Sequence, residues 1–326
     1  MSLILGIEST AHTLGVAAFD SGKNRLLANE KDTFIPPIGA GMIPRDVADH
    51  HSEKVGELLG RAFRKAGKGK IDYVAYSRGP GLGPVLRVGL AIARTVSANL
   101  GVPLVPVNHP VAHIEIGKWA AQARDPVVLY VSGGNTQVIA LAGGKYRVFG
   151  ETLDIPIGNA LDVFARDQNL PFPGGPEIER LARAGKKLIE LPYVVKGMDL
   201  SYSGLLTHCR KLARSGKHSL EDICYSFQEH CFAMLVEVTE RAVAHTGKRE
   251  VLITGGVAAN RRLAEMLEIM CRERGAEFKI VPMEFAGDNG AMIAVTGALM
   301  SGRTIPLKKA DIDPRFRVDE QEVYWK

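Results

Sequence analysis

Two histidines four residues apart are the side chains of this sequence best spaced to act together. His109 and His113 lie in the segment NHPVAHIE, where Asn108 can cap a helix and Pro110 suits its first turn. Residues four apart share one face of a helix, so both imidazoles can reach a single metal ion. A helix N-terminus also disfavours the charged imidazolium, which predicts two neutral rings available as ligands.

The histidine pair has other interpretations. The two rings could be unrelated, one at a helix end and the other packed in a core. A zinc protease is disfavoured, because the motif is not His-Glu-x-x-His and the glutamate that serves as general base is missing.

Glycine-containing turns could bring backbone close to a phosphate. The segment YVSGGNT places Ser132, Gly133, Gly134 and Asn135 between two strand-like runs, where backbone amides can approach phosphate oxygens, although a plain hairpin would look the same. The turn of residues 8–10 occupies the equivalent place near the chain start, and we expect it to face the same phosphates.

Two further glycine segments precede helices. The segment LITGGVAAN leads into a helix that Asn260 can cap, and it would suit an adenine or ribose as well as a plain strand end. Residues 79–84, GPGLGP, lack the Lys-Ser/Thr ending of a P-loop, so we interpret them as a structural or lid loop.

Three carboxylates accompany these turns. Asp288, in FAGDNG, is either the cap of the last helix or an inward ligand, and general helix preferences favour the cap. Asp162 and Glu179 could hydrogen-bond ribose hydroxyls or simply be solvated helix charges. Basic clusters at residues 64–70, 208–217, 261–262 and 303–317 are ordinary for solvated faces, but together they could line a path for an RNA backbone.

The elements that position these residues form two similar series. In the first, three strand-like runs in residues 3–34 form an antiparallel meander, followed by a helix at 47–66, strand DYVAYS, a helix at 85–100 and strand PLVPV. From residue 126 a second meander follows, then a helix at 159–167, a Pro/Gly-rich stretch, a polar region and a long helix at 220–245. Strand EVLITGG, a helix and strand EFKIV complete a parallel crossover before the last helix at 290–299.

This pattern predicts an α/β fold with a duplicated sheet-and-helix unit, the two-lobed architecture shared by actin, sugar kinases and Hsp70 (ASKHA). We expect residues 1–108, completed by 295–326, to form one lobe and residues 109–294 the other. A nucleotide would then lie in the cleft between the lobes.

Composition restricts the class of protein. The chain has 326 residues, 46% hydrophobic and 24% charged, which argues against extensive disorder and fits two compact lobes. Long uncharged apolar runs and a secretion signal are lacking, so we expect a cytoplasmic protein with no membrane role. The four cysteines never form a Cys-x-x-Cys pair, which predicts buried or idle thiols. The net charge of +5 permits a nucleic-acid partner without requiring one.

The order and spacing of NHPVAHIE, LYVSGGNTQ, GNALDVFAR, PGGPEIE, LITGGVAANRRL and AGDNGAM closely resemble the universal tRNA threonylcarbamoyladenosine transferase family. The resemblance spans nearly the whole chain. Asn135 stands where the bacterial branch carries histidine, so the chain resembles the archaeal and eukaryotic branch, the catalytic subunit of the KEOPS complex.

The resemblance implies a set of site residues. Metal ligands would be His109, His113, Asp288 and the phenolic oxygen of Tyr130, of which His109, His113 and Asp288 are the expected catalytic residues. The implied metal is one Fe²⁺ per chain, and zinc also suits these ligand types. Implied contacts to ATP or to threonylcarbamoyl-AMP come from Tyr130, Val131, Ser132, Gly133, Gly134, Asn135, Asp162, Gly175, Glu179 and Asn260.

The implied reaction is transfer of a threonylcarbamoyl group from threonylcarbamoyl-AMP to N6 of adenosine 37 in tRNAs that read ANN codons. The implied partners are tRNA, an upstream threonylcarbamoyl-AMP synthase, and KEOPS subunits including a small kinase-like protein and a dimerising subunit. Alternatives are an ATP-binding phosphotransferase or ATPase of the same fold, a metalloprotease and a non-catalytic ATP-binding adapter. A phosphotransferase would hold magnesium by carboxylates and water, with no use for paired histidines.

Overall fold

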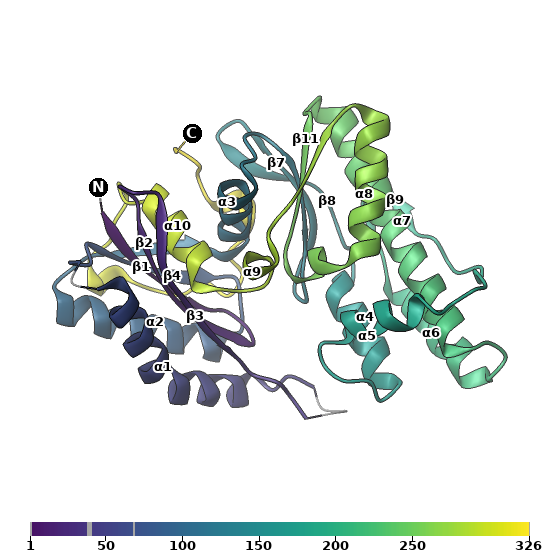
Figure 1. Ribbon diagram of the computed structural model, residues 1–326, viewed down its shortest axis with the longest axis horizontal. Coiled ribbons are helices and arrows are strands. Elements are labelled where there is room, and N and C mark those ends of the chain that lie inside the picture. The colour runs from purple at the N-terminus through teal and green to yellow at the C-terminus, as the bar shows by residue number, and fades with distance from the viewer. Residues whose placement is uncertain (1, 38–40, 68, 326) are drawn as a thin grey trace.

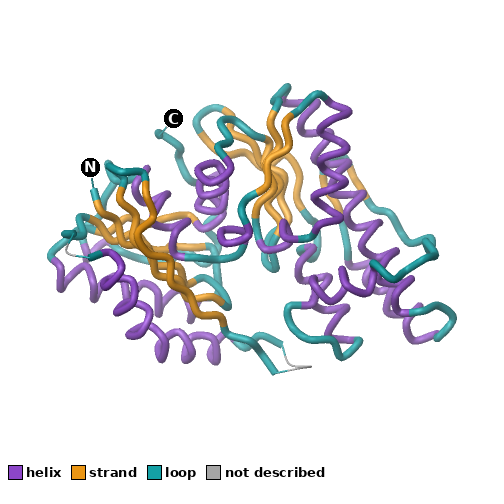
Figure 2. Tube along the Cα trace, in the orientation of Figure 1, coloured by secondary structure: helices purple, strands orange, loops and turns teal. Residues whose placement is uncertain are grey.

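A computed structural model describes residues 2–37, 41–67 and 69–325 of the chain. Two five-stranded sheets lie side by side along the long axis of the molecule, each accompanied by helices (Figure 1). Figure 2 shows the strands gathered in these two groups, with most helices on the outer sides. The predicted two-lobed α/β architecture is therefore confirmed.

The first sheet contains the predicted meander and crossover. Its strands are β1 (Leu3–Ser9), β2 (Thr13–Asp20), β3 (Arg25–Thr33), β4 (Tyr73–Gly79) and β5 (Leu104–Asn108). They lie in the order β3-β2-β1-β4-β5; β1 to β3 are antiparallel, whereas β4 and β5 run parallel to β1. Every residue of β1 is buried, because helices cover both faces of the sheet.

Different helices cover the two faces of this sheet. On one face, Leu5 and Ile7 belong to the same buried cluster as residues of α1 (Pro44–Ala66) and α2 (Gly83–Leu100). On the other face α10 (Gly290–Leu299) packs so closely that a Cβ at Gly6 would lie 2.4 Å from the backbone nitrogen of Ala294. Glycine is therefore required in β1 for this approach.

The second sheet repeats this topology. Its strands are β6 (Val127–Val131), β7 (Thr136–Ala142), β8 (Lys145–Glu151), β11 (Glu250–Thr254) and β12 (Glu277–Ile280), in the order β12-β11-β6-β7-β8. The corresponding strands of the two sheets thus occupy the same places, which confirms the predicted duplication. A separate two-stranded ribbon consists of β9 (Val195–Lys196) and β10 (Asp199–Leu200).

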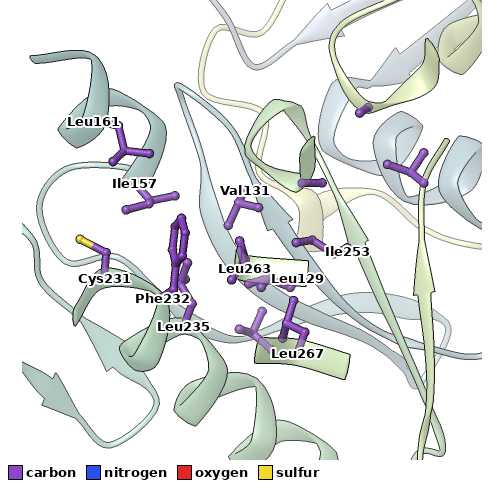
Figure 3. Close-up of a cluster of buried hydrophobic side chains, with 14 of the residues drawn as sticks. Leu129, Val131, Ile157, Leu161, Cys231, Phe232, Leu235, Ile253, Leu263 and Leu267 are labelled. Atoms are coloured by element: carbon purple, nitrogen blue, oxygen red, sulfur yellow. The ribbon is translucent and has the colours of Figure 1, made fainter. Parts of the chain in front are cut away.

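Helices follow the second meander and enclose a core with this sheet. They are α4 (Ile157–Asp167), α5 (Gly174–Ala182), α6 (Ser203–Ser215), α7 (Leu220–Thr246), α8 (Arg261–Arg274) and the short α9 (Met283–Ala286), with the 3₁₀ turn η1 (Gly256–Ala259). Two further 3₁₀ turns lie in the tail of the chain: η2 (Leu307–Lys309), which packs on the first lobe, and η3 (Val318–Glu320). Figure 3 shows part of this core, in which Ile157 and Leu161 of α4 lie near Phe232 of α7. Cys231 belongs to it, and all four cysteines are buried as predicted. Within the described residues, none of the helices has the length and apolar character needed to cross a membrane.

Helix α3 (His109–Ala121) starts where β5 ends and lies between the two sheets (Figure 1). Its first nine residues are all buried. A Cβ at Gly117 would lie 3.0 Å from Leu252 of β11, so α3 packs tightly on the second sheet. Both predicted metal ligands on α3 are therefore held inside the molecule, at the junction of the two lobes.

Candidate functional site

The histidine pair lies at the first turn of α3, as predicted. The side-chain oxygen of Asn108 accepts a hydrogen bond from the Val111 amide at 3.1 Å, which caps the helix. Its amide nitrogen donates to the carbonyls of Phe316 and Arg317, so the tail of the chain anchors the cap. The rings of His109 and His113 are 4.8 Å apart between centroids and are both buried.

Asp288 completes a group of three possible metal ligands. Its Oδ1 lies 3.1 Å from Nε2 of His113 and 3.6 Å from Nε2 of His109. One ligand atom from each of the three residues lies within 4.8 Å of the others. Two imidazole nitrogens and a carboxylate oxygen are the donor set of many iron and zinc sites, so the residues fit a transition-metal ion.

The expected role of Asp288 as helix cap is wrong. Asn289 caps α10 instead, because its side-chain oxygen accepts from the Met292 amide at 3.0 Å. The neighbouring carboxylate is therefore free to face the histidines.

Glu8 contacts the histidine pair, a neighbour that the sequence did not predict for it. Its Oε2 lies 3.1 Å from Nδ1 of His109, whereas its Oε1 accepts from the Thr10 amide at 2.9 Å. Glu8 was expected to face phosphates, and it faces His109, one of the three possible metal ligands, instead. The available sequence signal was a carboxylate near the end of the apolar strand-like run LILGIES, where charged residues are uncommon.

The two histidines differ in charge when no ion is bound. Burial lowers the pKa of both rings; for His109, however, the charges of Glu8 and Asp288 outweigh burial and raise the pKa to about 9. The pKa of His113 is lowered, with burial as the main cause. Burial acts to raise the pKa of Asp288, but His109 and His113 hold it below its usual range. The expectation of two neutral rings thus applies to His113 and fails for His109, because carboxylates outweigh the helix N-terminus.

Tyr130 lies against this group from β6. Its ring centroid is 5.0 Å from that of His113, and its hydroxyl oxygen accepts from the side-chain amide of Asn135 at 3.4 Å. Burial raises the pKa of Tyr130, so the phenol carries its proton when no ion is bound.

A hollow of about 550 Å³ opens between the lobes beside the three possible metal ligands, His109, His113 and Asp288. Its walls include the β1–β2 turn, the loop at residues 80–82, the turn at 132–135, α4 and the loop that precedes α5. His109 and Asp288 are part of the wall. Five of the predicted nucleotide contacts also line it: Ser132, Gly133, Gly134, Asn135 and Asp162.

The glycine turn at residues 132–135 presents bare backbone to the hollow. A Cβ at Gly133 or Gly134 would meet no atom within 4 Å. The hydroxyl of Ser132 accepts from the Gly134 and Asn135 amides at 3.3 and 3.0 Å, which stabilises the turn. Gly158 of α4 lies beneath it, because a Cβ there would be 2.6 Å from the Ser132 carbonyl oxygen.

The remaining predicted contacts have other neighbours. Tyr130, Val131, Gly175, Glu179 and Asn260 are not among the described residues that line the hollow. Glu179 pairs with Arg183 at 2.6 Å. Asn260 caps α8, as predicted, and its amide nitrogen donates to Gln228. Gly174, rather than Gly175, lines the hollow, and its amide donates to Asp162 at 2.7 Å.

Several residues of the hollow were missed. His12 and Phe172 line it without belonging to any segment predicted to do so, and Arg166 lines it although only Asp162 was predicted from the segment GNALDVFAR. Thr10 lines it from the turn of residues 8–10. The loop at residues 80–82, interpreted as a structural or lid loop, also lines it, and a Cβ at Gly81 would lie 2.7 Å from the Thr10 carbonyl oxygen. These residues come together only through the arrangement of the lobes.

Comparison with known proteins identifies close relatives. The model of a family described as tRNA N6-adenosine threonylcarbamoyltransferase matches residues 25–295. Proteins with that name from Methanopyrus kandleri and Archaeoglobus fulgidus are 57% and 54% identical, over 99% of this chain and 96% and 99% of theirs. A protein of Methanocaldococcus jannaschii named as probable bifunctional tRNA threonylcarbamoyladenosine biosynthesis protein is 54% identical over 99% of this chain and 60% of its own length.

Solved structures support the fold alone. T. kodakarensis HypF aligns with a TM-score of 0.66 at 17% identity, over 92% of this chain and 47% of that chain. The activator of 2-hydroxyisocaproyl-CoA dehydratase from Clostridium difficile, with bound ADPNP, aligns with a TM-score of 0.53 at 13% identity, over 95% and 99% of the two chains. A ROK family glucokinase from Streptomyces griseus aligns with a TM-score of 0.50 at 14% identity, over 91% and 98%.

Proposed function

Because the chain belongs to the tRNA N6-adenosine threonylcarbamoyltransferase family, we propose that the hollow between its lobes is the site of this transfer. The chain is a transferase of threonylcarbamoyladenosine (t6A) synthesis. One observation carries the placement of the site: Asp288 joins His109 and His113 at the wall of a hollow built from both lobes.

The metal proposed for this centre is iron, with zinc as the chemical alternative. His109, His113 and Asp288 would hold it, together with the phenolic oxygen of Tyr130. Burial supports this assignment, since the three ligands belong to a largely enclosed site and the ring of Tyr130 lies against His113. A bound cation would supply Lewis-acid polarisation of the carbamoyl carbonyl.

The proposed bound nucleotide is threonylcarbamoyl-AMP, with ATP able to occupy the same place. The hollow of about 550 Å³ lies within the range of about 300–1,000 Å³ typical of small-molecule sites. Ser132, Gly133, Gly134 and Asn135 would contact the phosphate, and Asp162 would contact the ribose. Val131, Gly175, Glu179 and Asn260 would contribute from the strand and helices behind these residues.

In the proposed reaction, N6 of adenosine 37 in an ANN-reading tRNA attacks the carbamoyl carbonyl carbon. A bond forms between N6 and this carbon, the bond from the carbon to the phosphate oxygen breaks, and AMP leaves, its phosphate accepting the proton that N6 gives up. The chain's own contribution is to hold the two reactants at the correct distance and orientation.

Two alternative activities meet specific obstacles in this site. A metalloprotease would need a general-base glutamate on α3, where Pro110, Val111 and Ala112 separate the histidines. A phosphotransferase would hold magnesium by oxygen ligands, whereas two of the three ligands here are imidazoles.

The proposed setting is the cytoplasm, with tRNA, an upstream threonylcarbamoyl-AMP synthase and KEOPS subunits, among them a small kinase-like protein and a dimerising subunit. The bifunctional name of the longer relative supports the presence of a partner activity. We also propose that residues 1–108 with 295–326 form the first lobe and residues 109–294 the second. The packing of α10 on the first sheet supports the return of the chain to the first lobe, and its contacts with that sheet begin already at Gly290.

Reconstitution tests the proposed function. The purified chain, its partners, threonine, bicarbonate, ATP and unmodified tRNA would be incubated, and the nucleoside products would be analysed by mass spectrometry. We expect the unchanged chain to form t6A. The variant His113→Ala should form none, because it should lose the bound metal while it still binds ATP. His245→Ala, a change at an exposed histidine of α7, is the control. No t6A under any metal, or full activity of His113→Ala, would contradict the proposal.

A further inference from the structure

A second hollow lies close to the first, at the C-terminal end of α4. Its volume is about 220 Å³, and it is lined by Asp167, Gln168, Arg210, Ala213 and Arg214. Arg166, the residue before Asp167, lines the nucleotide hollow. The end of α4 thus separates the two hollows, and Figure 1 shows α4 and α6 together at one edge of the second lobe.

The second hollow is basic because of the face that α6 presents. Arg210 and Arg214 are four residues apart and lie on one face of the helix, whereas Leu206 and Cys209 are buried. Arg210 pairs with Asp167. Arg214 is exposed and forms no ion pair with any residue that the structure describes.

The cluster at residues 208–217, one of the four basic clusters noted in the sequence, keeps most of its cations unpaired among the described residues. Lys211 and Lys217 are exposed, and within the described chain neither forms an ion pair. By contrast, Arg262 is held by Glu229 and Glu265, and Arg317 is held by Glu151 and Asp319. Lys65 pairs with Glu30 and Arg303 with Glu322. The other clusters also keep cations without an ion pair among the described residues, such as Lys308, Lys309 and Arg315. What distinguishes the cluster on α6 is therefore its place beside the nucleotide hollow.

We propose that this hollow and the basic face of α6 bind the phosphate backbone of the tRNA whose adenosine enters the neighbouring hollow. The inference rests on the proposed function and adds a location for the RNA. Arginine binds phosphate through several N–H groups at once, so the neighbouring guanidinium groups of Arg210 and Arg214 are suited to a phosphate. An adenosine turned into the nucleotide hollow leaves the adjacent phosphates at its rim, where Arg166 and then α6 are situated.

Binding of labelled, unmodified tRNA to the full chain, measured by fluorescence anisotropy at several salt concentrations, tests this inference. Arg214→Ala removes one phosphate contact, and we expect binding to weaken about fivefold at 0.1 M salt, with a shallower salt dependence. Asp167→Asn removes the carboxylate that neutralises Arg210, so we expect tighter binding. Opposite signs from two neighbouring changes would be hard to explain by a loss of folding.

Arg272→Ala on α8 is the matched control, because Arg272 is also exposed and unpaired among the described residues. In Figure 1, α8 and α6 lie at different ends of the second lobe. Unchanged tRNA affinity in both Arg214→Ala and Asp167→Asn, as expected if the face serves an acidic protein, would overturn the inference. The inference would also be overturned if Arg272→Ala weakened tRNA binding as much as Arg214→Ala, or if the unchanged chain bound no tRNA at low salt.

The binding assay needs neither nucleotide nor transfer. Weaker tRNA binding by Arg214→Ala in a chain that makes no t6A would support the RNA site and contradict the proposed function. If the unchanged chain makes t6A and all variants bind tRNA normally, the proposed function would be supported and the RNA site contradicted.

Discussion

The carboxylate of Glu8 lies 3.1 Å from Nδ1 of His109. Strand β1 of the first sheet thus contacts the imidazole ring that α3 places between the two sheets. The ring donates its Nδ1–H to Glu8, which leaves Nε2 on the side of Asp288, 3.6 Å away. Carboxylates that hold metal-ligating histidines in this way orient the ring and increase its basicity. Glu8 would therefore orient His109 as a ligand of the proposed metal without itself belonging to the group of three possible ligands.

Glu8→Gln should weaken metal binding about 10- to 100-fold, as is typical when such a carboxylate is removed. The amide can still hydrogen-bond, but it no longer carries the charge that strengthens the imidazole. Calorimetric titration of the metal-free chain with zinc or Fe²⁺ measures the change. Glu30→Gln is the control, because Glu30 is a buried carboxylate of β3 in the same sheet that pairs with Lys65. If Glu8→Gln and Glu30→Gln bind the metal with equal affinity, Glu8 does not strengthen metal binding by His109.

The stability of the metal-free chain should fall as pH rises through the alkaline range. The pKa of His109 is raised from 6.5 to about 9, so the folded state favours the protonated ring. That contribution is complete below pH 6.5 and is lost as pH rises to about 9, because over this range the folded state holds a proton that the unfolded state has released. Urea unfolding of chelator-treated protein at pH 6.5, 7.5 and 9 measures it. A decline as steep in Glu8→Gln as in the unchanged chain would exclude His109 as its source.

Local sequence patterns predicted most of the strands and long helices. The meanders were visible as short apolar runs separated by glycine turns, and the last helix has the predicted bounds, Gly290–Leu299. Helix α6 was missed within a region interpreted as polar. Its buried residues, Leu205, Leu206 and Cys209, form too narrow an apolar stripe to stand out from its basic residues.

The site was predictable where its parts share one helix or one turn. His109 and His113 followed from spacing, and Asn135 and its glycine neighbours from a local turn signal. The pairing of Glu8 with His109 spans 101 residues and depends on how α3 enters between the sheets. The inward direction of Asp288 likewise depended on which of two adjacent residues caps α10, a choice that capping preferences alone do not settle.

Two glycines near the phosphate turn should respond differently to alanine. In Gly158→Ala the new methyl would lie 2.6 Å from the Ser132 carbonyl oxygen, and we expect a loss of about 1–3 kcal/mol in stability as the turn is displaced. In Gly133→Ala the methyl would meet no protein atom within 4 Å, but it would project where a ligand approaches the backbone. We therefore expect near-normal stability with weaker ATP binding. Thermal unfolding with calorimetric ATP titration separates the two effects, and normal ATP binding by Gly133→Ala would argue against a phosphate at this turn.

The buried carboxylate of Glu115, further along α3, joins the tail of the chain to the helix that carries His109 and His113. Its Oε1 accepts from the Tyr146 hydroxyl at 2.5 Å and from the Trp325 indole at 3.0 Å, while Lys118 lies 3.2 Å from its Oε2. Trp325→Phe keeps most of the ring but removes one donor to a buried charge, and we expect a loss of about 1.5–3 kcal/mol in stability.

Trp119→Phe offers the matched comparison for that prediction. Trp119 is also on α3, but its indole donates at 2.8 Å to the neutral side chain of Asn24 at an exposed position, where a lost hydrogen bond is replaced by water. We expect the Trp119 variant to lose less than about 1 kcal/mol in urea unfolding. A loss in Trp119→Phe that equals or exceeds the loss in Trp325→Phe would show that the buried charge of Glu115 does not bind the tail to α3.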